Sequence, residues 1–73
     1  MASFSDEQII SALEKIETDQ QLTLLLVDFE NISHADVAEI TGVPVETVNS
    51  RVVQGRMELK KILSFMQHKS ESR

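Results

Sequence analysis

The fold is decided by residues 33–58, which read SHADVAEITGVPVETVNSRVVQGRME. Ser33 is a favourable N-cap, and Asp36 follows in the first turn, where the helix dipole favours a negative charge. Gly42 stands where a residue with positive φ commonly ends a helix, and Pro44 suits the first turn of the next one. The stretch therefore predicts two helices joined by a tight turn, which is the outline of a helix-turn-helix.

Apolar spacing indicates how the two helices of this motif pack. Val37, Ala38 and Ile40 are expected to face inward from the first helix, and the small Ala38 lets the second helix approach closely. Val48 is expected to anchor the second helix against the first. The second helix is predicted to be long, with this inner stripe at helical spacing: Val48, Val52, Gly55, Leu59, Ile62, Leu63 and Met66.

Two further helices are predicted before the motif. The first follows a capping box at Ser5 and Gln8, and the second follows the same signature at Thr18 and Gln21. Each carries an apolar stripe: Ile9, Leu13 and Ile16 in the first, and Leu22, Leu25, Leu26 and Phe29 in the second. The chain is thus expected to be a single all-α domain (1–73) of four helices at 6–17, 19–29, 34–41 and 45–66, with a polar tail at 67–73.

The composition excludes several classes of site. There is no cysteine, and His34 and His68 lie far apart, so no disulfide, metal centre or cofactor is expected. No nucleophile stands beside a base and no glycine-rich phosphate loop is present, so an enzyme is not expected. The longest apolar run, residues 24–27, is far too short to cross a bilayer, and the N-terminus is polar. We expect a soluble cytoplasmic protein with no membrane partner.

The charge of the chain is unevenly distributed. The net charge is −5. Residues 1–45 carry nine acidic residues and one lysine, a net charge of −8, whereas residues 46–73 carry three acidic and six basic residues, a net charge of +3. The positive segment could face phosphates while the acidic part faces solvent or a protein. An ordinary mixed surface remains the alternative.

The outward face of the second motif helix carries the candidate functional residues. Thr, Asn, Ser, Gln and Arg side chains can bond base edges or phosphates, which indicates a double-stranded DNA partner. The candidates for DNA binding are Glu46, Thr47, Asn49, Ser50, Arg51, Gln54, Arg56 and Lys60. Val53 and Met57 are expected to be exposed on the same helix. Val53 could touch thymine methyl groups, the pair could form a protein-binding patch, or both could be scattered surface residues. The alternative is a plain αα-hairpin with a polar outer face.

Residues 22–51 resemble region 4 of bacterial sigma factors, in particular the extracytoplasmic-function group. The resemblance is carried by Asp28-Phe29-Glu30, by Ser33 to Ala38, and by the Gly-Val-Pro and Thr-Val-Asn-Ser-Arg elements of Gly42 to Arg51. It extends over about residues 8–65. It implies recognition of the −35 promoter element by the second motif helix during transcription initiation, and docking of another surface on the β flap of RNA polymerase. An anti-sigma factor is a further candidate partner.

The resemblance also implies roles for individual residues. Asn49, Ser50, Arg51 and Gln54 fall where the family contacts bases or backbone, and Arg56 falls where it carries a phosphate-facing arginine. Asn49 and Gln54 replace residues that are usually basic, which implies fewer phosphate contacts. Gly55 replaces the alanine that the family prefers, at an expected cost of about 0.5–1 kcal/mol in a helix interior.

The resemblance covers region 4 only, and the region 2 of a complete sigma factor is not found in this sequence. The chain is therefore expected to be an excised domain or a stand-alone relative. Two other interpretations of the residues stay open. One is a protein-interaction module that kept the fold and lost DNA binding, with polymerase, an anti-sigma factor or a second copy as partner. The other is the helix-turn-helix of a response-regulator output domain, which shares the Thr-Val pair but fits Asp28-Phe29-Glu30 less well.

Overall fold

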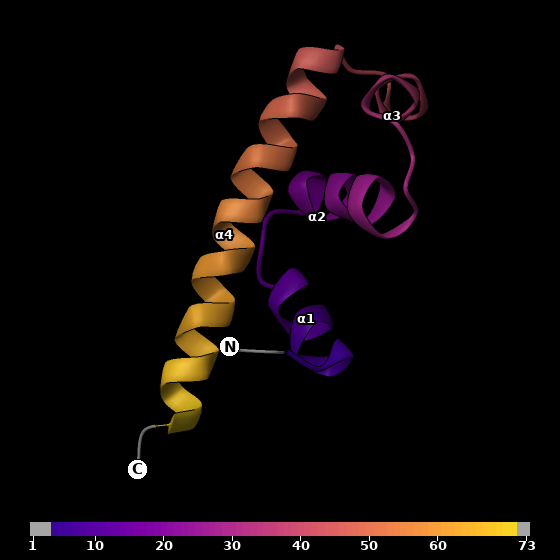
Figure 1. The fold of residues 1–73 in the computed structure, drawn as a ribbon. Coiled ribbons are helices and arrows are strands. Elements are labelled where there is room, and N and C mark those ends of the chain that lie inside the picture. Colours follow the sequence, from indigo (N-terminus) through magenta and orange to yellow (C-terminus); the bar gives the residue numbers. More distant parts are fainter. Residues whose placement is uncertain (1–3, 72–73) are drawn as a thin grey trace.

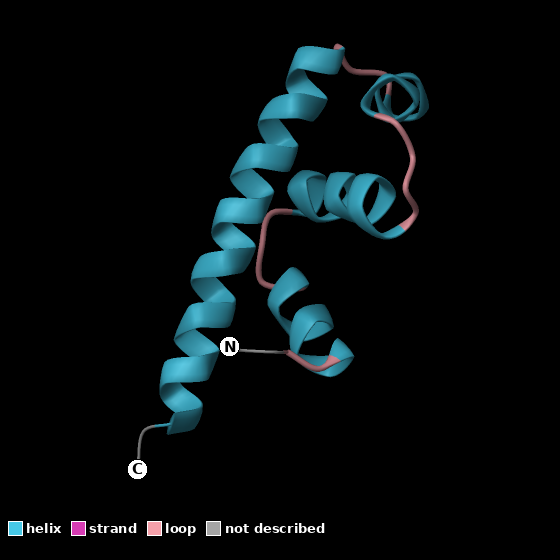
Figure 2. Cartoon of the chain, in the orientation of Figure 1, coloured by secondary structure: helices cyan, strands magenta, loops and turns pink. Residues whose placement is uncertain are grey.

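A computed structural model describes the backbone of residues 4–71 and the side chains of residues 4–66. The elements in chain order are α1 (Asp6–Leu13), α2 (Thr18–Leu24), the π-helical turn η1 (Leu25–Phe29), α3 (His34–Thr41) and α4 (Val45–Glu71). The described residues contain helices and loops but no strand (Figure 2), which confirms the predicted all-α class. α4 runs the length of the molecule, and α1, α2 and α3 are stacked along one side of it (Figure 1).

Of the caps predicted for the first two helices, one is present in the structure and the other is not. The capping box of α1 is confirmed: the Gln8 N–H donates to Ser5 Oγ at 3.2 Å, and the Ser5 N–H donates to Gln8 Oε1 at 3.0 Å. The cap predicted for α2 is wrong. Thr18 is already the first helical residue, and Glu17 occupies the N-cap position without a side-chain hydrogen bond.

α1 ends at Leu13, whereas the sequence predicted a helix to residue 17. The N–H of Ile16 donates to the carbonyl of Leu13 at 3.2 Å, and Lys15 pairs with Ala12 in the same way. These three-residue hydrogen bonds tighten the end of the helix and turn the chain toward α2. Ile16 is thereby carried into the core.

The buried face of α2 is not the predicted one. Leu22, Leu25 and Phe29 are exposed, and the buried residues of α2 are Thr23 and Leu24. The sequence does not predict this buried face, because one of its two buried residues is a threonine, which is usually exposed. Thr23 can be buried because its hydroxyl donates to the carbonyl of Asp19 at 2.7 Å, which satisfies the polar group inside the helix.

The turn of the helix-turn-helix forms as the sequence predicts. Ser33 Oγ accepts from the Asp36 N–H at 3.1 Å, and Gly42 ends α3 in the left-handed region with φ 74°. α3 packs inward through Val37 and, in part, Ala38. The inward placement of Ile40 is wrong, since its side chain is 62% exposed. A helix of eight residues presents one narrow face to the core, and Ile40 lies outside it.

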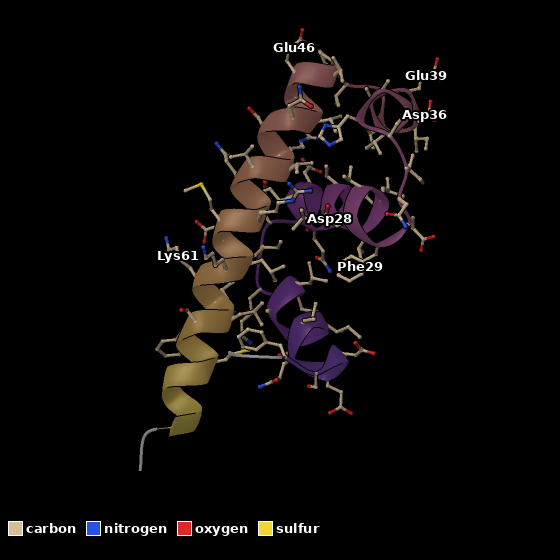
Figure 3. The ribbon with its side chains drawn as sticks, in the orientation of Figure 1. Asp28, Phe29, Asp36, Glu39, Glu46 and Lys61 are labelled. Atoms are coloured by element: carbon tan, nitrogen blue, oxygen red, sulfur yellow. The ribbon has the colours of Figure 1, made fainter. Side chains whose placement is uncertain are left out.

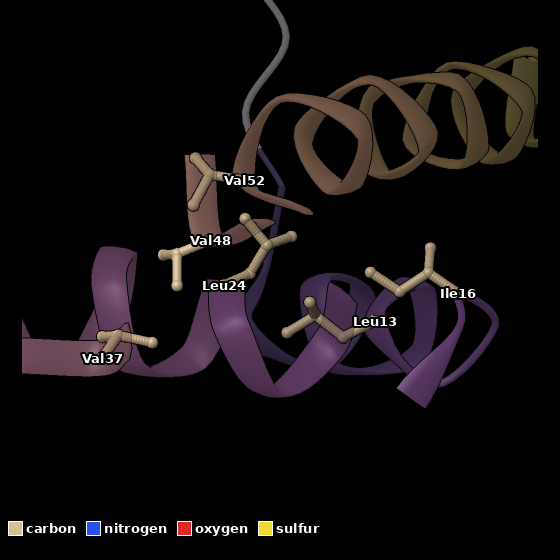
Figure 4. Packing of buried hydrophobic residues seen from close by; sticks show 6 residues of the cluster. All are labelled: Leu13, Ile16, Leu24, Val37, Val48 and Val52. Atoms are coloured by element: carbon tan, nitrogen blue, oxygen red, sulfur yellow. The ribbon is translucent and has the colours of Figure 1, made fainter. Parts of the chain in front are cut away.

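The core lies where α1, α2 and α3 meet α4 (Figure 4). It is formed by Leu13, Ile16, Leu24, Val37, Val48 and Val52. The inner stripe of α4 is buried from Val48 to Gly55 and only half-buried from Leu59 to Met66. Because few side chains cover that last part, most of the packing energy falls in the first half of α4.

Gly55 is the point at which α2 crosses α4. A Cβ atom at this position would lie 3.0 Å from Leu24 Cδ1, 3.1 Å from Leu24 Cγ and 3.4 Å from Gln20 Cβ. These separations are tighter than ordinary carbon contacts. The glycine therefore lets the two helices approach, and the cost expected from its helix propensity is offset by the packing of Leu24.

α4 continues to Glu71, five residues beyond the predicted end of the helix. Residues 72–73 of the predicted polar tail lie outside the described residues. Val53 and Met57 are 56% and 61% exposed, which confirms their predicted placement. Within residues 4–71, no helix has both the length and the apolar character that crossing a bilayer needs.

Replacing Gly55 with alanine is expected to destabilise the chain by about 1 kcal/mol. Overpacking against Leu24, of about 1–3 kcal/mol, outweighs the gain of about 0.5–1 kcal/mol in helix propensity. Chemical denaturation followed by circular dichroism measures the difference.

The control is the same substitution in a Leu24→Ala background, where the added methyl group has room. There Gly55→Ala is expected to stabilise the chain, so the two effects have opposite signs. A stabilising Gly55→Ala in the otherwise unaltered chain contradicts the tight crossing.

Candidate nucleic-acid interface

The first half of α4 turns an outer ridge away from the core. With about 100° per residue, Glu46, Ser50, Val53 and Met57 fall on the side opposite Val48. All four ridge residues are exposed. The ridge carries one carboxylate and no positive charge. It can offer hydrogen bonds and apolar contacts to a partner, but it does not attract phosphates by itself.

One flank of α4 is held by the N-terminal end of α2. Arg51 Nη2 donates to Asp19 Oδ2 at 3.4 Å, and Gln20 Nε2 donates to Gln54 Oε1 at 3.3 Å. The Arg51 side chain is only 25% exposed. Two of the predicted DNA-binding residues are therefore bonded within the chain on this flank.

The opposite flank is held by η1. Arg56 Nε and Nη2 donate to the two carboxylate oxygens of Asp28, at 3.0 and 2.5 Å. This fork of two parallel bonds is the strongest geometry that an arginine and a carboxylate can form. The hydrogen bond to Asp28 raises the pKa of Arg56 above its ordinary value. Asp28 is labelled on the helical ribbon that α2 and η1 form (Figure 3).

The same flank contains a contact between α3 and α4. His34 Nδ1 lies 2.5 Å from Asn49 Oδ1. His34 is the first residue of α3 and is half-buried, whereas Asn49 is exposed. The ring nitrogen donates to the amide oxygen in the histidine tautomer that carries its proton on Nδ1.

All eight predicted DNA-binding residues lie on α4, but their exposure and their hydrogen bonds within the chain differ. Glu46 and Ser50 lie on the outer ridge, and Thr47 is half-buried. The residues bonded to α2, η1 or α3 are Asn49, Arg51, Gln54 and Arg56. Lys60 lies about 16 Å along the helix from Asn49, at about 1.5 Å per residue, and borders a surface cavity of about 310 Å³ together with Phe4 and Leu63. Asn49 and Lys60 therefore cannot contact the same base pair.

The charges around this surface are largely balanced within the chain. Asp19 and Asp28 each neutralise one arginine of α4. Asp36, Glu39 and Glu46 gather at the end of the molecule formed by α3 and the start of α4 (Figure 3). A phosphate backbone approaching this end meets carboxylates as well as paired guanidinium groups.

The partners of the α4 side chains were missed by sequence reasoning. These partners are Asp19, Gln20, Asp28 and His34. They lie 15 to 34 residues from the side chains they bond. No local spacing connects them, because the contacts depend on how α2, η1 and α3 pack against α4.

Comparison with known proteins places the chain in a family. Residues 6–59 match the family model described as sigma-70, region 4. The chain is 39% identical over 57 residues to the ECF RNA polymerase sigma factor EcfG of Rhodopseudomonas palustris, which covers 78% of this chain and 32% of that protein.

Two further relatives extend the comparison. The ECF RNA polymerase sigma factor SigC of Mycobacterium tuberculosis is 37% identical over 49 residues, 67% of this chain and 26% of its own. The RNA polymerase sigma factor YlaC of Bacillus subtilis is 34% identical over 55 residues, 75% of this chain and 32% of its own. The chain thus spans about a quarter to a third of the curated relatives it matches. The described residues fold into α1, α2, η1, α3 and α4, with a helix-turn-helix of α3 and α4. The chain belongs to the sigma-70 region 4 family.

Proposed function

We propose that this chain is a promoter-binding domain that reads the −35 element as part of transcription initiation by RNA polymerase. The observation that carries the proposal is the rigid pairing of α3 and α4 through Val37 and Val48, both fully buried. The first turns of α4 lie at one end of the molecule, beside α3 (Figure 1). The major groove of B-DNA is wide enough to admit such a helix.

The exposed side chains suit different parts of a DNA site. Ser50 and Asn49 can bond base edges, and Val53 can contact a thymine methyl group. Arg51 and Arg56, on the two flanks, can reach phosphates on either side of the groove, where contacts fix the register without reading sequence. To do so, each arginine exchanges its aspartate for a phosphate. DNA binding by this chain alone is therefore expected to be weak, with the shallow salt dependence that few phosphate contacts give.

We propose that docking to RNA polymerase supplies much of the remaining affinity. An apolar surface suited to such docking lies between α1 and η1, away from α4. It borders a cavity of about 330 Å³ that is lined by Asp6, Ile9, Ile10, Leu13, Leu25 and Phe29. Ile10, Leu25 and Phe29 are exposed there. A contiguous apolar surface of this kind marks a protein contact, for which the β flap is the proposed partner.

A second candidate function is a protein-interaction module with little DNA binding. The paired arginines favour it, because the two positive charges best placed for phosphates already have carboxylate partners. In that case the partner is polymerase, an anti-sigma factor or a second copy of the chain. DNA binding by the purified chain separates the two functions.

The double variant Arg51→Ala, Arg56→Ala tests the DNA-binding proposal. It is expected to lose at least about tenfold in affinity for a −35-like duplex at low salt, since a good base or phosphate contact contributes about 1–3 kcal/mol. Fluorescence anisotropy with a labelled duplex measures the loss.

The matched control is Lys15→Ala, Lys61→Ala, which removes the same charge from exposed positions away from the first turns of α4. The control is expected to retain affinity within about threefold. Equal binding by the parent and the arginine variant contradicts the assignment of α4 and leaves the protein-interaction module.

The aspartates that pair with the arginines are expected to limit DNA affinity. Asp19→Asn, Asp28→Asn should raise affinity for the same duplex by about two- to fivefold, because each exposed ion pair contributes up to about 1 kcal/mol to holding its arginine. The control Glu7→Gln, Glu14→Gln changes the net charge equally at exposed sites on and just after α1. The pairing is not limiting if both double variants gain the same affinity.

A further inference from the structure

The second half of α4 carries an apolar surface that the other helices leave partly uncovered. After Gly55 the inner stripe of α4 is only half-buried, and Phe65 is 66% exposed. α4 continues past α1 toward the C-terminus (Figure 1). A cavity of about 410 Å³ lies on this part of the helix and is lined by Lys15, Glu58, Lys61, Ile62, Phe65 and Met66.

This cavity is an open groove along α4, because four of its six lining residues are exposed. Its apolar floor is formed by Ile62, Phe65 and Met66. These positions follow the i, i+3, i+4 spacing of one helix face, which spans about 6 Å along the axis. A partner helix can lay its own apolar face into a groove of this kind. Addition of a partner strand would need a sheet edge, and residues 4–71 contain no strand.

The rim of the groove is positive although the chain as a whole is acidic. Lys15 is the only lysine or arginine in the first half of the chain, and the fold brings it to the same groove as Lys61. Glu58, the one carboxylate of the lining, is paired with Lys61 at 3.6 Å. Glu14 and Glu17 are close to Lys15 in the chain but do not line the groove. Ammonium groups beside an apolar floor favour a partner that carries carboxylates beside an apolar face.

We propose that this groove is a docking site for an acidic amphipathic helix of a partner protein. The apolar face of that helix packs on Phe65 and its apolar neighbours, and its carboxylates pair with Lys15 and Lys61. The groove shares no lining residue with the cavity proposed to face the β flap. Phe65 lies about 22 Å along α4 from Ser50, at about 1.5 Å per residue, so DNA and the partner helix can bind at once. The proposal does not depend on DNA binding.

Two designed peptides test the groove with the full chain. Each is an amphipathic helix of about 18 residues, long enough to hold helical structure, with leucine at the i, i+3, i+4 and i+7 positions of one face. The positions beside that face are glutamate in one peptide and lysine in the other. The chain is expected to bind the acidic peptide at least about tenfold more tightly at low salt. The net charge of −5 by itself predicts the opposite preference. Fluorescence anisotropy with labelled peptides measures both affinities.

Charge reversal at the rim separates the groove from the rest of the surface. Lys15→Glu and Lys61→Glu are each expected to lose at least about fivefold in affinity for the acidic peptide. The matched control is Lys60→Glu, which reverses the neighbouring charge on α4 but lines a different cavity. It should retain affinity for the acidic peptide within about threefold.

Truncation of the floor tests the apolar contact. Phe65→Ala is expected to lose about tenfold in affinity for the acidic peptide, because a large aromatic anchor is removed. Met57→Ala is the control, since Met57 is similarly exposed on the same helix but does not line the groove. Circular dichroism confirms that each variant is folded, which exposed positions should allow.

Other occupants of the groove give different results. Failure to bind the acidic peptide more tightly than the basic one overturns the proposal, as does equal binding of the acidic peptide by the parent and Lys61→Glu. If Lys15→Ala, Lys61→Ala loses as much DNA affinity as the arginine variant, DNA occupies the groove instead. If the parent forms a dimer in sedimentation velocity that Phe65→Ala dissociates, a second copy occupies it. A chain that prefers the acidic peptide but binds no duplex keeps this docking site and loses only the DNA-binding function.

Discussion

The packing of Leu24 over Gly55 is the contact on which the rest of the structure depends. A Cβ atom at Gly55 would come within 3.0 Å of the Leu24 side chain, so only glycine admits this approach without a shift. At the close crossing, α2 and η1 reach the two opposite flanks of α4. One end then brings Asp19 to Arg51, and the other end brings Asp28 to Arg56. A single small residue thereby sets the environment of both arginines.

For the proposed function, the consequence is that the helix proposed to meet DNA has polar side chains that are already bonded to other helices. Bonds from α2, η1 and α3 hold these side chains, and the two arginines must give up their aspartates before they can contact phosphates. The same bonds neutralise positive charge, which lowers attraction to phosphates. These bonds fit the proposal that the domain binds DNA weakly by itself and gains affinity from other contacts within a larger assembly. The exposed apolar surface near Phe29 is suited to such a contact (Figure 3).

Local chemistry made part of this structure predictable. The Ser5 and Ser33 caps and the Gly42 turn each depend on residues within four positions, so the sequence predicts them correctly. The buried face of α2 could not be predicted, because it includes a polar residue. Thr23 can be buried only because its hydroxyl donates to a carbonyl of its own helix. The partners of the α4 side chains could not be predicted either, since they depend on how α2, η1 and α3 pack against α4. From the sequence, Gly55 is expected only to lower the stability of the helix. In the structure it permits the close crossing of α2 and α4.

The most direct test of the crossing is a nuclear Overhauser experiment on the free chain in solution. The Leu24 methyl protons and the Gly55 α protons occupy the space that a Cβ atom would otherwise fill. The crossing predicts strong cross-peaks between them. Their absence in a folded chain, with Leu24 methyl contacts to other residues instead, would contradict the packing of α2 over α4 and the placement of Asp19 and Asp28 that follows from it.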